Sequence, residues 1–153
     1  MRIDFIDPFL EATEEIIREV LNVEPKRGEM ELNEQETIPD IGVFLGLTGQ
    51  ASGRMLINFD KNLALKIIEV MNGEPHALES EMGQATIGEL GNMITGRAVT
   101  KLYEKGFHFN LTPPSVIVGN NVRVSTLGIE TLSVPYHISY GNLEINISIK
   151  ENV

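Results

Sequence analysis

The first regular pattern along the chain is amphipathic. Apolar side chains recur three and four residues apart from Phe9 to Leu21, which is the spacing of one face of an α-helix. Asp7 followed by Pro8 matches a capping residue with proline at the first helical position, and Pro25 cannot continue a helix. The pattern predicts a helix over residues 8–22, and a polar connector follows over residues 26–39.

Two more helices are predicted in the middle of the chain. Asp60 is placed to cap a helix with a single apolar stripe, and Asn72 and Gly73 mark its end because both residues tolerate a left-handed backbone. The longest helical pattern runs from Ser80 to about Lys105 and stops at a glycine.

The remaining apolar runs have the length and alternation of strands. They cover residues 41–47, 53–59, 115–118, 122–127, 132–139 and 143–150. The first two are expected to form a hairpin with a loose turn over residues 48–52, and the clean alternation of the last run indicates that one of its faces is buried. Helices interleaved with hairpins predict an α+β fold, a largely antiparallel β-sheet packed with long α-helices, in one domain over residues 1–153.

Composition narrows the classes of function. Acidic residues number 22 against 12 basic ones, so the formal charge of −10 argues against nucleic-acid binding and is interpreted as a source of solubility. Without cysteine the chain has no disulfide, thiol nucleophile or thiolate metal site. The apolar run over residues 41–47 is too short to span a membrane, and residues 1–4 lack the start of a signal peptide. We expect a cytoplasmic protein that does not insert into membranes.

Familiar catalytic and metal-binding patterns do not account for this sequence. His76, His108 and His137 lack the spacing of metal ligands and are interpreted as structural. The glycine-rich segment over residues 46–53 lacks the lysine of a phosphate-binding loop and joins two strands, so it is interpreted as a turn. The sequence also has no Gly-x-Ser-x-Gly nucleophile elbow.

The long helix is more informative. At 100° per residue its core stripe comprises Ile87, Leu90, Gly91, Ile94, Ala98 and Leu102. The opposite side comprises Ala85, Glu89, Asn92, Met93, Gly96 and Tyr103. A solvated helix face usually carries lysine, arginine and glutamate, so this face of small, amide and apolar groups around one carboxylate predicts a protein contact surface.

Three glycines inside the same helix support this prediction. Each costs about 1 kcal/mol relative to alanine, so some interaction must offset the cost. Gly91 lies on the core side, where close helix packing explains it, and Gly88 lies on the flank. Gly96 faces outward, where the close approach of a partner explains it better.

Glu89 and Asn92 place a carboxylate and an amide one helical turn apart, with about 5–6 Å between their Cβ atoms. The same spacing occurs at residues 19 and 22 and at residues 69 and 72. In both of those pairs the asparagine is expected to close a helix, so the pairs are interpreted as structural. Only Glu89 and Asn92 lie within a helix on the predicted contact face.

The segment over residues 87–96, Ile-Gly-Glu-Leu-Gly-Asn-Met-Ile-Thr-Gly, and the segment over residues 112–119, Thr-Pro-Pro-Ser-Val-Ile-Val-Gly, resemble the CheX branch of the CheC/CheX/FliY chemotaxis phosphatases. The glycine-rich hairpin, the following helix and the closing strands occur in the same order. The resemblance therefore covers nearly the whole chain, and the block around Glu89 is its most specific part.

The resemblance implies a phosphatase that acts on a phosphorylated CheY-type response regulator. Glu89 would pair with a lysine in the regulator's active site, and Asn92 would orient water for attack on the aspartyl phosphate. Ala85, Met93 and Gly96 would contact the partner, although the family often has Asp or Ser where this chain has Ala85. Phosphoryl transfer depends chiefly on positioning and charge stabilisation, so an amide that holds water suffices. Mg²⁺ would belong to the partner, and the chain would need no cofactor of its own.

The resemblance further implies a homodimer, because CheX-like proteins are dimers, and the strand over residues 143–150 is the expected pairing edge. Two other functions also fit the contact face. It could belong to a non-catalytic module that docks on a response regulator or a signalling complex, or to a structural dimerisation domain.

Overall fold

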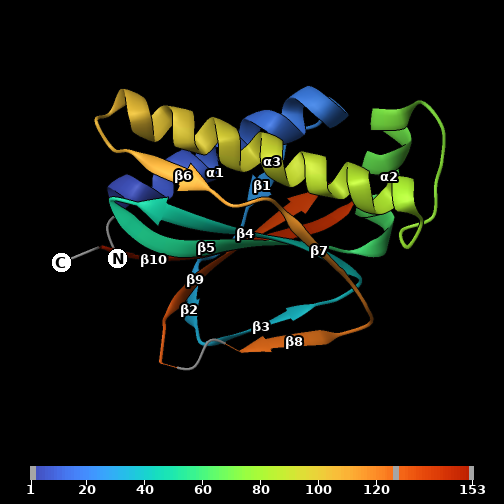
Figure 1. Ribbon diagram of the computed structural model, residues 1–153. Coiled ribbons are helices and arrows are strands. Elements are labelled where there is room, and N and C mark those ends of the chain that lie inside the picture. The colour runs from blue at the N-terminus through green and yellow to red at the C-terminus, as the bar shows by residue number, and fades with distance from the viewer. Residues whose placement is uncertain (1–2, 126–127, 152–153) are drawn as a thin grey trace.

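The computed structural model describes residues 3–125 and 128–151. They form an α+β fold with three helices packed on one face of an antiparallel sheet and a two-stranded ribbon on the other face (Figure 1). The helices are α1 (Ile3–Leu21), α2 (Lys61–Asn72) and α3 (Glu81–Glu104). The strands are β1 (Lys26–Arg27), β2 (Glu31–Asn33), β3 (Gln35–Ile38), β4 (Ile41–Gly49), β5 (Ala51–Phe59), β6 (Phe109–Leu111), β7 (Ser115–Val118), β8 (Val122–Ser125), β9 (Thr131–Ile138) and β10 (Gly141–Glu151).

The main sheet has the strand order β1-β9-β10-β5-β4-β6, with β2 also paired to β9 and β7 also paired to β4. Its strand pairs are antiparallel, and β3 and β8 form the separate ribbon. These observations confirm the predicted fold class. The pairing of β4 with β5 ends at Leu47 and Gly53, as expected for a hairpin with a loose turn. Residues 48–49 and 51–52 nevertheless continue as strand, paired with β6 and β10, so the turn itself is shorter than the predicted residues 48–52.

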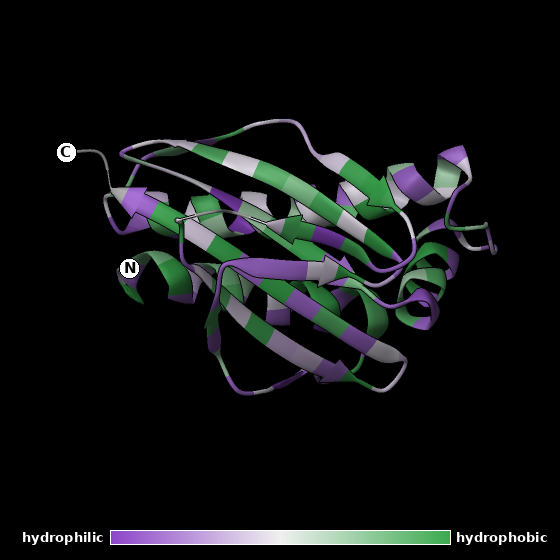
Figure 2. Cartoon of the chain, turned by 90° about the horizontal axis from the view of Figure 1, so that it is seen from below, coloured by the Kyte–Doolittle hydropathy of each residue, from purple (hydrophilic) through white to green (hydrophobic). Residues whose placement is uncertain are grey.

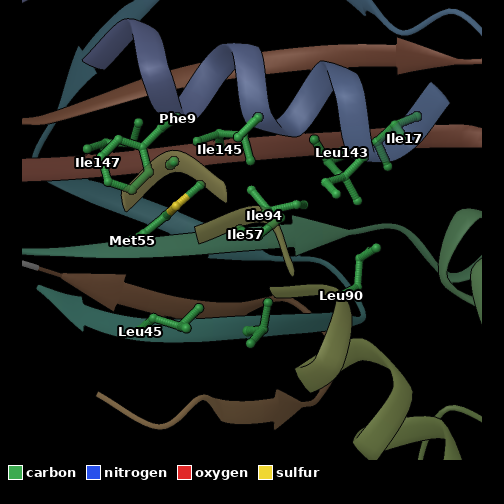
Figure 3. Close-up of a cluster of buried hydrophobic side chains, with 14 of the residues drawn as sticks. Phe9, Ile17, Leu45, Met55, Ile57, Leu90, Ile94, Leu143, Ile145 and Ile147 are labelled. Carbon is green, nitrogen blue, oxygen red and sulfur yellow. The ribbon is translucent and has the colours of Figure 1, made fainter. Parts of the chain in front are cut away.

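The sheet face beneath the helices is apolar. Ile145 and Ile147 of β10 point toward the helices beside Ile57 and Met55 of β5, and Phe9 of α1 covers them (Figure 3). All five side chains are buried. The alternation along residues 143–150 therefore reports a buried face, as predicted.

The opposite face of the same strands is polar although the β3–β8 ribbon covers part of it. Figure 2, which views this side, shows polar and apolar residues alternating along the strands. Ser133 donates a hydrogen bond to Asn146 at 2.6 Å, and Arg54 forms an ion pair with the buried Glu36 at 3.2 Å. Burial between the strands raises the pKa of the Glu144 carboxyl. Sequence alternation alone does not distinguish such a face from a solvated one.

The first helix begins five residues before its predicted start. It starts at Ile3, so Pro8 lies inside it and Asp7 is not its cap, which corrects the predicted boundary. Phe5 and Ile6 are buried, and Phe5 packs edge-on against the rings of Phe107 and Phe109. Burying two such side chains contributes about 1.5–3 kcal/mol each, which outweighs the roughly 3 kcal/mol cost of an interior proline.

The connector over residues 26–39 is not simply a loop, because it contains β1, β2 and β3. These strands are two to four residues long and mostly exposed, so they lack the apolar alternation that identifies a strand. The last two residues of the strand predicted over residues 122–127 lie outside the described residues.

The expected dimer edge is wrong. β10 is an interior strand: it pairs with β5 from Leu143 to Glu151 and with β9 from Gly141 to Ile147. Asn146 therefore has strand neighbours on both sides, and a second copy of the chain cannot pair there without breaking the sheet. The homodimer stays a prediction, but its interface must use another surface.

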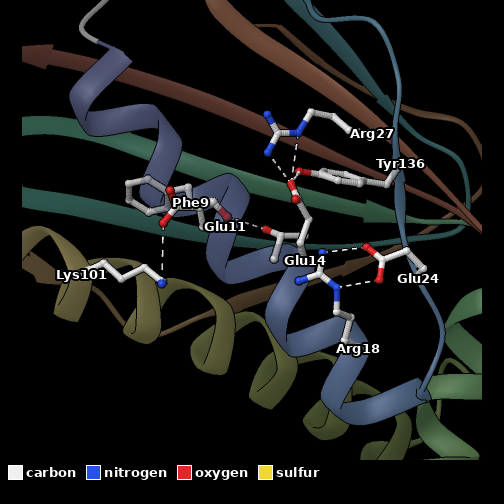
Figure 4. A network of polar contacts seen from close by, with 9 residues as sticks. Phe9, Glu11, Glu14, Arg18, Glu24, Arg27, Lys101 and Tyr136 are labelled. Carbon is white, nitrogen blue, oxygen red and sulfur yellow. Dashed lines mark hydrogen bonds and ion pairs between the residues drawn. The ribbon is translucent and has the colours of Figure 1, made fainter.

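Ion pairs join α1 to α3 along their exposed sides. Arg97 pairs with Glu19 at 2.7 Å and with Glu15 at 3.4 Å. Lys101 pairs with Glu15 at 2.8 Å and with Glu11 at 3.7 Å, and the Lys101–Glu11 contact is drawn in Figure 4. Figure 4 also shows Glu14 and its bonds on the other side of α1. These pairs fix how the two helices lie against each other.

Two glycines of α3 provide a matched test of the helix packing. A Cβ atom at Gly91 would lie 2.8 Å from both methyl groups of the buried Val43, whereas one at Gly96 would meet no atom within 4 Å. We expect Gly91→Ala to lower the free energy of unfolding by about 1 kcal/mol, because overpacking exceeds the gain in helix propensity. Gly96→Ala should raise it by about 0.5–1 kcal/mol. Urea unfolding midpoints measure both, and equal shifts of the same sign would contradict the packing described.

The ion pairs between α1 and α3 predict that the stability of the fold depends on pH. Hydrogen bonding to the Lys101 ammonium group lowers the pKa of Glu15 below its ordinary value of 4.5. Because the pKa of Glu15 is lower in the folded protein, its ion pair stabilises the fold at pH values above about 4.5. That stabilisation is lost as the pH falls through the pKa of Glu15 in the folded protein. We expect Lys101→Met to raise the Glu15 pKa. The pKa of Glu24, which Arg18 lowers, should stay unchanged as a control. Carboxyl NMR titration measures both, and an unmoved Glu15 would refute the assignment.

Candidate functional site

The contact face predicted from the sequence belongs to α3, whose position is fixed from several sides. The Ser80 side chain accepts a hydrogen bond from the Gly83 amide at 3.0 Å and caps the helix. Leu90 and Ile94 are buried in the core cluster between the helix and the sheet (Figure 3). The helix lies beside α1 and the strands β6 and β7 (Figure 1).

The two predicted sides of α3 differ in burial as expected. The six core-stripe residues are buried. On the other side Ala85, Glu89 and Tyr103 are exposed. Asn92 and Gly96 are half-buried, as is Met93, which also packs against the core. The outward side is therefore accessible at Glu89, and it becomes more enclosed along the next two turns.

The glycines of α3 have different surroundings. Gly91 approaches Val43 of β4 so closely that a Cβ atom would clash, which agrees with its predicted packing role. A Cβ at Gly88 would touch Val116 at 3.4 Å and Pro114 at 3.8 Å, in the segment that resembles the family's second motif. Gly96 faces open space, as predicted. Internal packing thus requires glycine at position 91, whereas a Cβ at position 88 would make only ordinary contacts and one at position 96 would meet no neighbouring atom.

The side chains of Glu89 and Asn92 do not stabilise the fold through polar contacts with other described residues. Within residues 3–125 and 128–151 neither side chain forms a hydrogen bond or ion pair. Asn92 is half-buried beside α1, which restricts its amide more than full exposure would. An unengaged carboxylate and amide on one exposed helix face are available to a second protein.

The two other pairs with the same spacing are structural, as predicted. Glu19 binds Arg97, and Asn22 adopts the left-handed backbone conformation that ends α1, with φ of 55°. Asn72 ends α2, where its amide donates to the Ile68 carbonyl and to the Thr86 hydroxyl, both at 2.8 Å. The same Glu-x-x-Asn spacing therefore carries different roles according to its place in the fold.

A hollow of about 420 Å³ opens beside Asn92. It is lined by Ile16 of α1 and by Asn92, Met93, Gly96, Arg97 and Thr100 of α3. Three of these residues are on the predicted contact face. The sequence did not single out the other three, because the approach of α1 to α3 is a tertiary contact that helical periodicity does not report.

The histidines do not form a second site. His76 lies 3.3 Å from Glu74, His137 contacts Asn142 at 2.9 Å, and His108 packs edge-on against Tyr103. Within the described ranges no cluster of histidine and acidic side chains has a metal-binding arrangement, and no helix is long and apolar enough to cross a membrane.

The arrangement suits contact chemistry in which the reacting group comes from another molecule. The amide of Asn92 can both donate and accept hydrogen bonds, so it can hold a water molecule, and Glu89 can bind a cation one turn away. An amide that holds water beside a carboxylate that binds a cation can serve a hydrolysis whose reacting group comes from a partner.

Comparison with known proteins gives a consistent answer. The family model described as chemotaxis phosphatase CheX matches residues 41–137. The CheY-P phosphatase CheX of Thermotoga maritima is 32% identical over 149 residues, with 95% of each chain covered. A CheC-like superfamily protein from Shewanella sp. PV-4 has a TM-score of 0.89 and 30% identity over 98% of this chain and 99% of its own.

One solved relative includes a partner. A chain of the CheX–CheY–BeF₃–Mg²⁺ complex from Borrelia burgdorferi has a TM-score of 0.82 and 37% identity over 98% of this chain and all of its own. Sequence and fold agree across nearly the full length of these relatives. This chain therefore belongs to the CheX family of chemotaxis phosphatases.

Proposed function

We propose that this protein dephosphorylates the aspartyl phosphate of a CheY-type response regulator, with Asn92 positioning the attacking water and Glu89 binding a lysine of the regulator. The observation that carries the proposal is the free pair itself. Glu89 and Asn92 lie one turn apart on an exposed helix face and bind no other described residue. The family membership and the CheY partner of the Borrelia relative support it.

The proposed hydrolysis requires from this chain only the amide of Asn92 and the carboxylate of Glu89. The aspartyl phosphate, and the Mg²⁺ that neutralises its oxygens, are supplied by the regulator. An amide held beside the phosphorus fixes the water for in-line attack and lowers the entropic part of the barrier. The Glu89 carboxylate would pair with a lysine ammonium group and so fix the depth to which Asn92 enters. The reaction and the partner would both be cytoplasmic.

Two alternatives remain distinct from the phosphatase. A non-catalytic docking module would use the same face to bind a regulator without accelerating phosphate loss. A structural dimerisation domain would cover the face with a second copy of this chain. Ala85, exposed one turn before Glu89, lacks the polar group that relatives often have, so partner affinity is the property most sensitive to that position.

The catalytic proposal predicts that Asn92→Ala abolishes the acceleration. Removing the amide leaves the water without its positioning group, so the regulator should lose its phosphate at its intrinsic rate. Candidate CheY-type receivers are phosphorylated with a small phosphodonor, and phosphate loss is followed with and without the protein. Asn22→Ala, in a pair of the same spacing, is the matched control and should keep full activity.

An Asn92→Ala protein as fast as the unmodified one would refute the water-positioning role. Tight binding by the unmodified protein without any acceleration would favour the docking module instead.

The proposed docking on the regulator predicts that substitutions at Glu89 and Gly96 change binding affinity as well as rate. Glu89→Ala should weaken both binding and rate, since a buried partner lysine would lose its counter-charge. Gly96→Leu should block association sterically while the fold stays intact, because position 96 faces open space. Titration against a receiver loaded with beryllofluoride measures affinity, and circular dichroism checks the fold. Unchanged affinity for both variants would move the interface to another surface.

A further inference from the structure

The hollow beside Asn92 is shared between two helices, whereas the catalytic pair lies on one. Ile16 of α1 lines it together with Met93, Gly96 and Thr100 of α3. Thr100 follows Asn92 by eight residues, which places it about 12 Å farther along the helix axis. A partner that reaches both Asn92 and Thr100 must therefore lie along α3 and contact α1.

We infer that the phosphorylated receiver docks across α1 and α3 together and inserts an apolar side chain into this hollow as a second anchor. The inference rests on the proposed function, because it takes the receiver as the partner, and it adds a contact that the Glu89–Asn92 pair does not require. Asn92 lines the hollow, so the second anchor is continuous with the proposed catalytic contact.

The hydrogen-bonding groups of the hollow are mostly engaged, which selects an apolar occupant. The Thr100 hydroxyl donates to the Gly96 carbonyl at 3.0 Å and leaves the threonine methyl group available. The Arg97 guanidinium is bound by Glu19 at 2.7 and 2.9 Å and by Glu15 at 3.4 Å. The Asn92 amide binds no other described residue, and the proposed catalysis needs it. A polar side chain entering here would lose its bonds to water without replacing them.

The ion pairs that flank the hollow join its two helices to each other. Arg97 and Lys101 lie on α3 one turn apart and reach the carboxylates of Glu11, Glu15 and Glu19 on α1. A surface depression whose two helices are already held together in the free protein saves the partner the entropic cost of ordering them. The hollow therefore suits an anchor that enters without rearrangement.

Charge around the hollow favours a basic neighbour on the partner. Along the α1 edge three carboxylates face two cations, so one negative charge is left uncompensated, and Glu89 adds another at the far end of the site. Glu11 and Glu19 stay about half exposed, with side-chain exposures of 50% and 55%. A receiver surface with an apolar side chain flanked by lysine or arginine complements this edge. The net charge of −10 also favours a partner with a positively charged surface.

The absence of cysteine from the sequence permits a direct footprint. Single-cysteine variants are made at Thr100 in the hollow, at Ala85 beside the catalytic pair, and at Asn120 in the exposed turn between β7 and β8. Each is modified with a maleimide, alone and with a saturating CheY-type receiver loaded with beryllofluoride and Mg²⁺. We expect the rate to fall at least tenfold for Thr100→Cys and Ala85→Cys, and to stay unchanged for Asn120→Cys.

The outcomes separate this inference from the proposed function. Protection of Ala85→Cys without protection of Thr100→Cys overturns the second anchor and leaves the phosphatase proposal standing. Protection of neither position overturns both. Equal slowing of all three variants, the Asn120 control included, also overturns the inference, because the protection would not be specific to the hollow.

Filling the hollow gives a second measurement that does not depend on labelling. Thr100→Phe should raise the Kd for the beryllofluoride-loaded receiver at least tenfold, because the ring would occupy the anchor's place. Thr100→Val keeps the shape of threonine and should bind within about twofold of the unmodified protein. Asn120→Phe adds the same ring away from the helices as a control. Unimpaired binding by Thr100→Phe overturns the inference.

Discussion

The close approach of α3 to β4 at Gly91 determines where the rest of the site stands. Without a side chain at position 91 the helix rests directly on the methyl groups of Val43, and any Cβ atom there would force the two elements apart. Because Glu89 and Asn92 flank this point within one turn, their height above the sheet and their direction follow from it. Access to the outward face thus depends on a contact made on the inward face.

The helix that carries the site is a poor helix by composition, and its neighbours compensate for this. Three interior glycines cost roughly 3 kcal/mol of helix propensity together. Burial of the core stripe, the Ser80 cap and the ion pairs to α1 offset that cost. A helix stabilised from outside can keep small residues where a partner must approach, and Gly96 is the position where that freedom is visible.

The sequence predicted the features that depend on local periodicity. The α2 and α3 boundaries, the core stripe and the outward position of Gly96 follow from spacing within one helix, and the structure agrees. The start of α1 was wrong because the aromatic contacts of Phe5 with Phe107 and Phe109 join residues a hundred positions apart. The central place of β10 was missed for a related reason, since alternation reveals a buried face but not whether a strand has one neighbour or two.

The three Glu-x-x-Asn pairs show why the motif alone is insufficient. In the first pair the glutamate is bound to Arg97 and the asparagine ends a helix; in the second the asparagine joins α2 to α3. Each of those asparagines has its position fixed by the fold, so neither is free to act on a partner. Asn92 differs because the fold gives it a position and leaves its amide unengaged. The ion pairs to α1 act close to it, because they engage the guanidinium group of Arg97, which lines the same hollow as Asn92, in bonds to Glu15 and Glu19. The acidic row on α1 thus has a role in the site although none of its residues belongs to the motif.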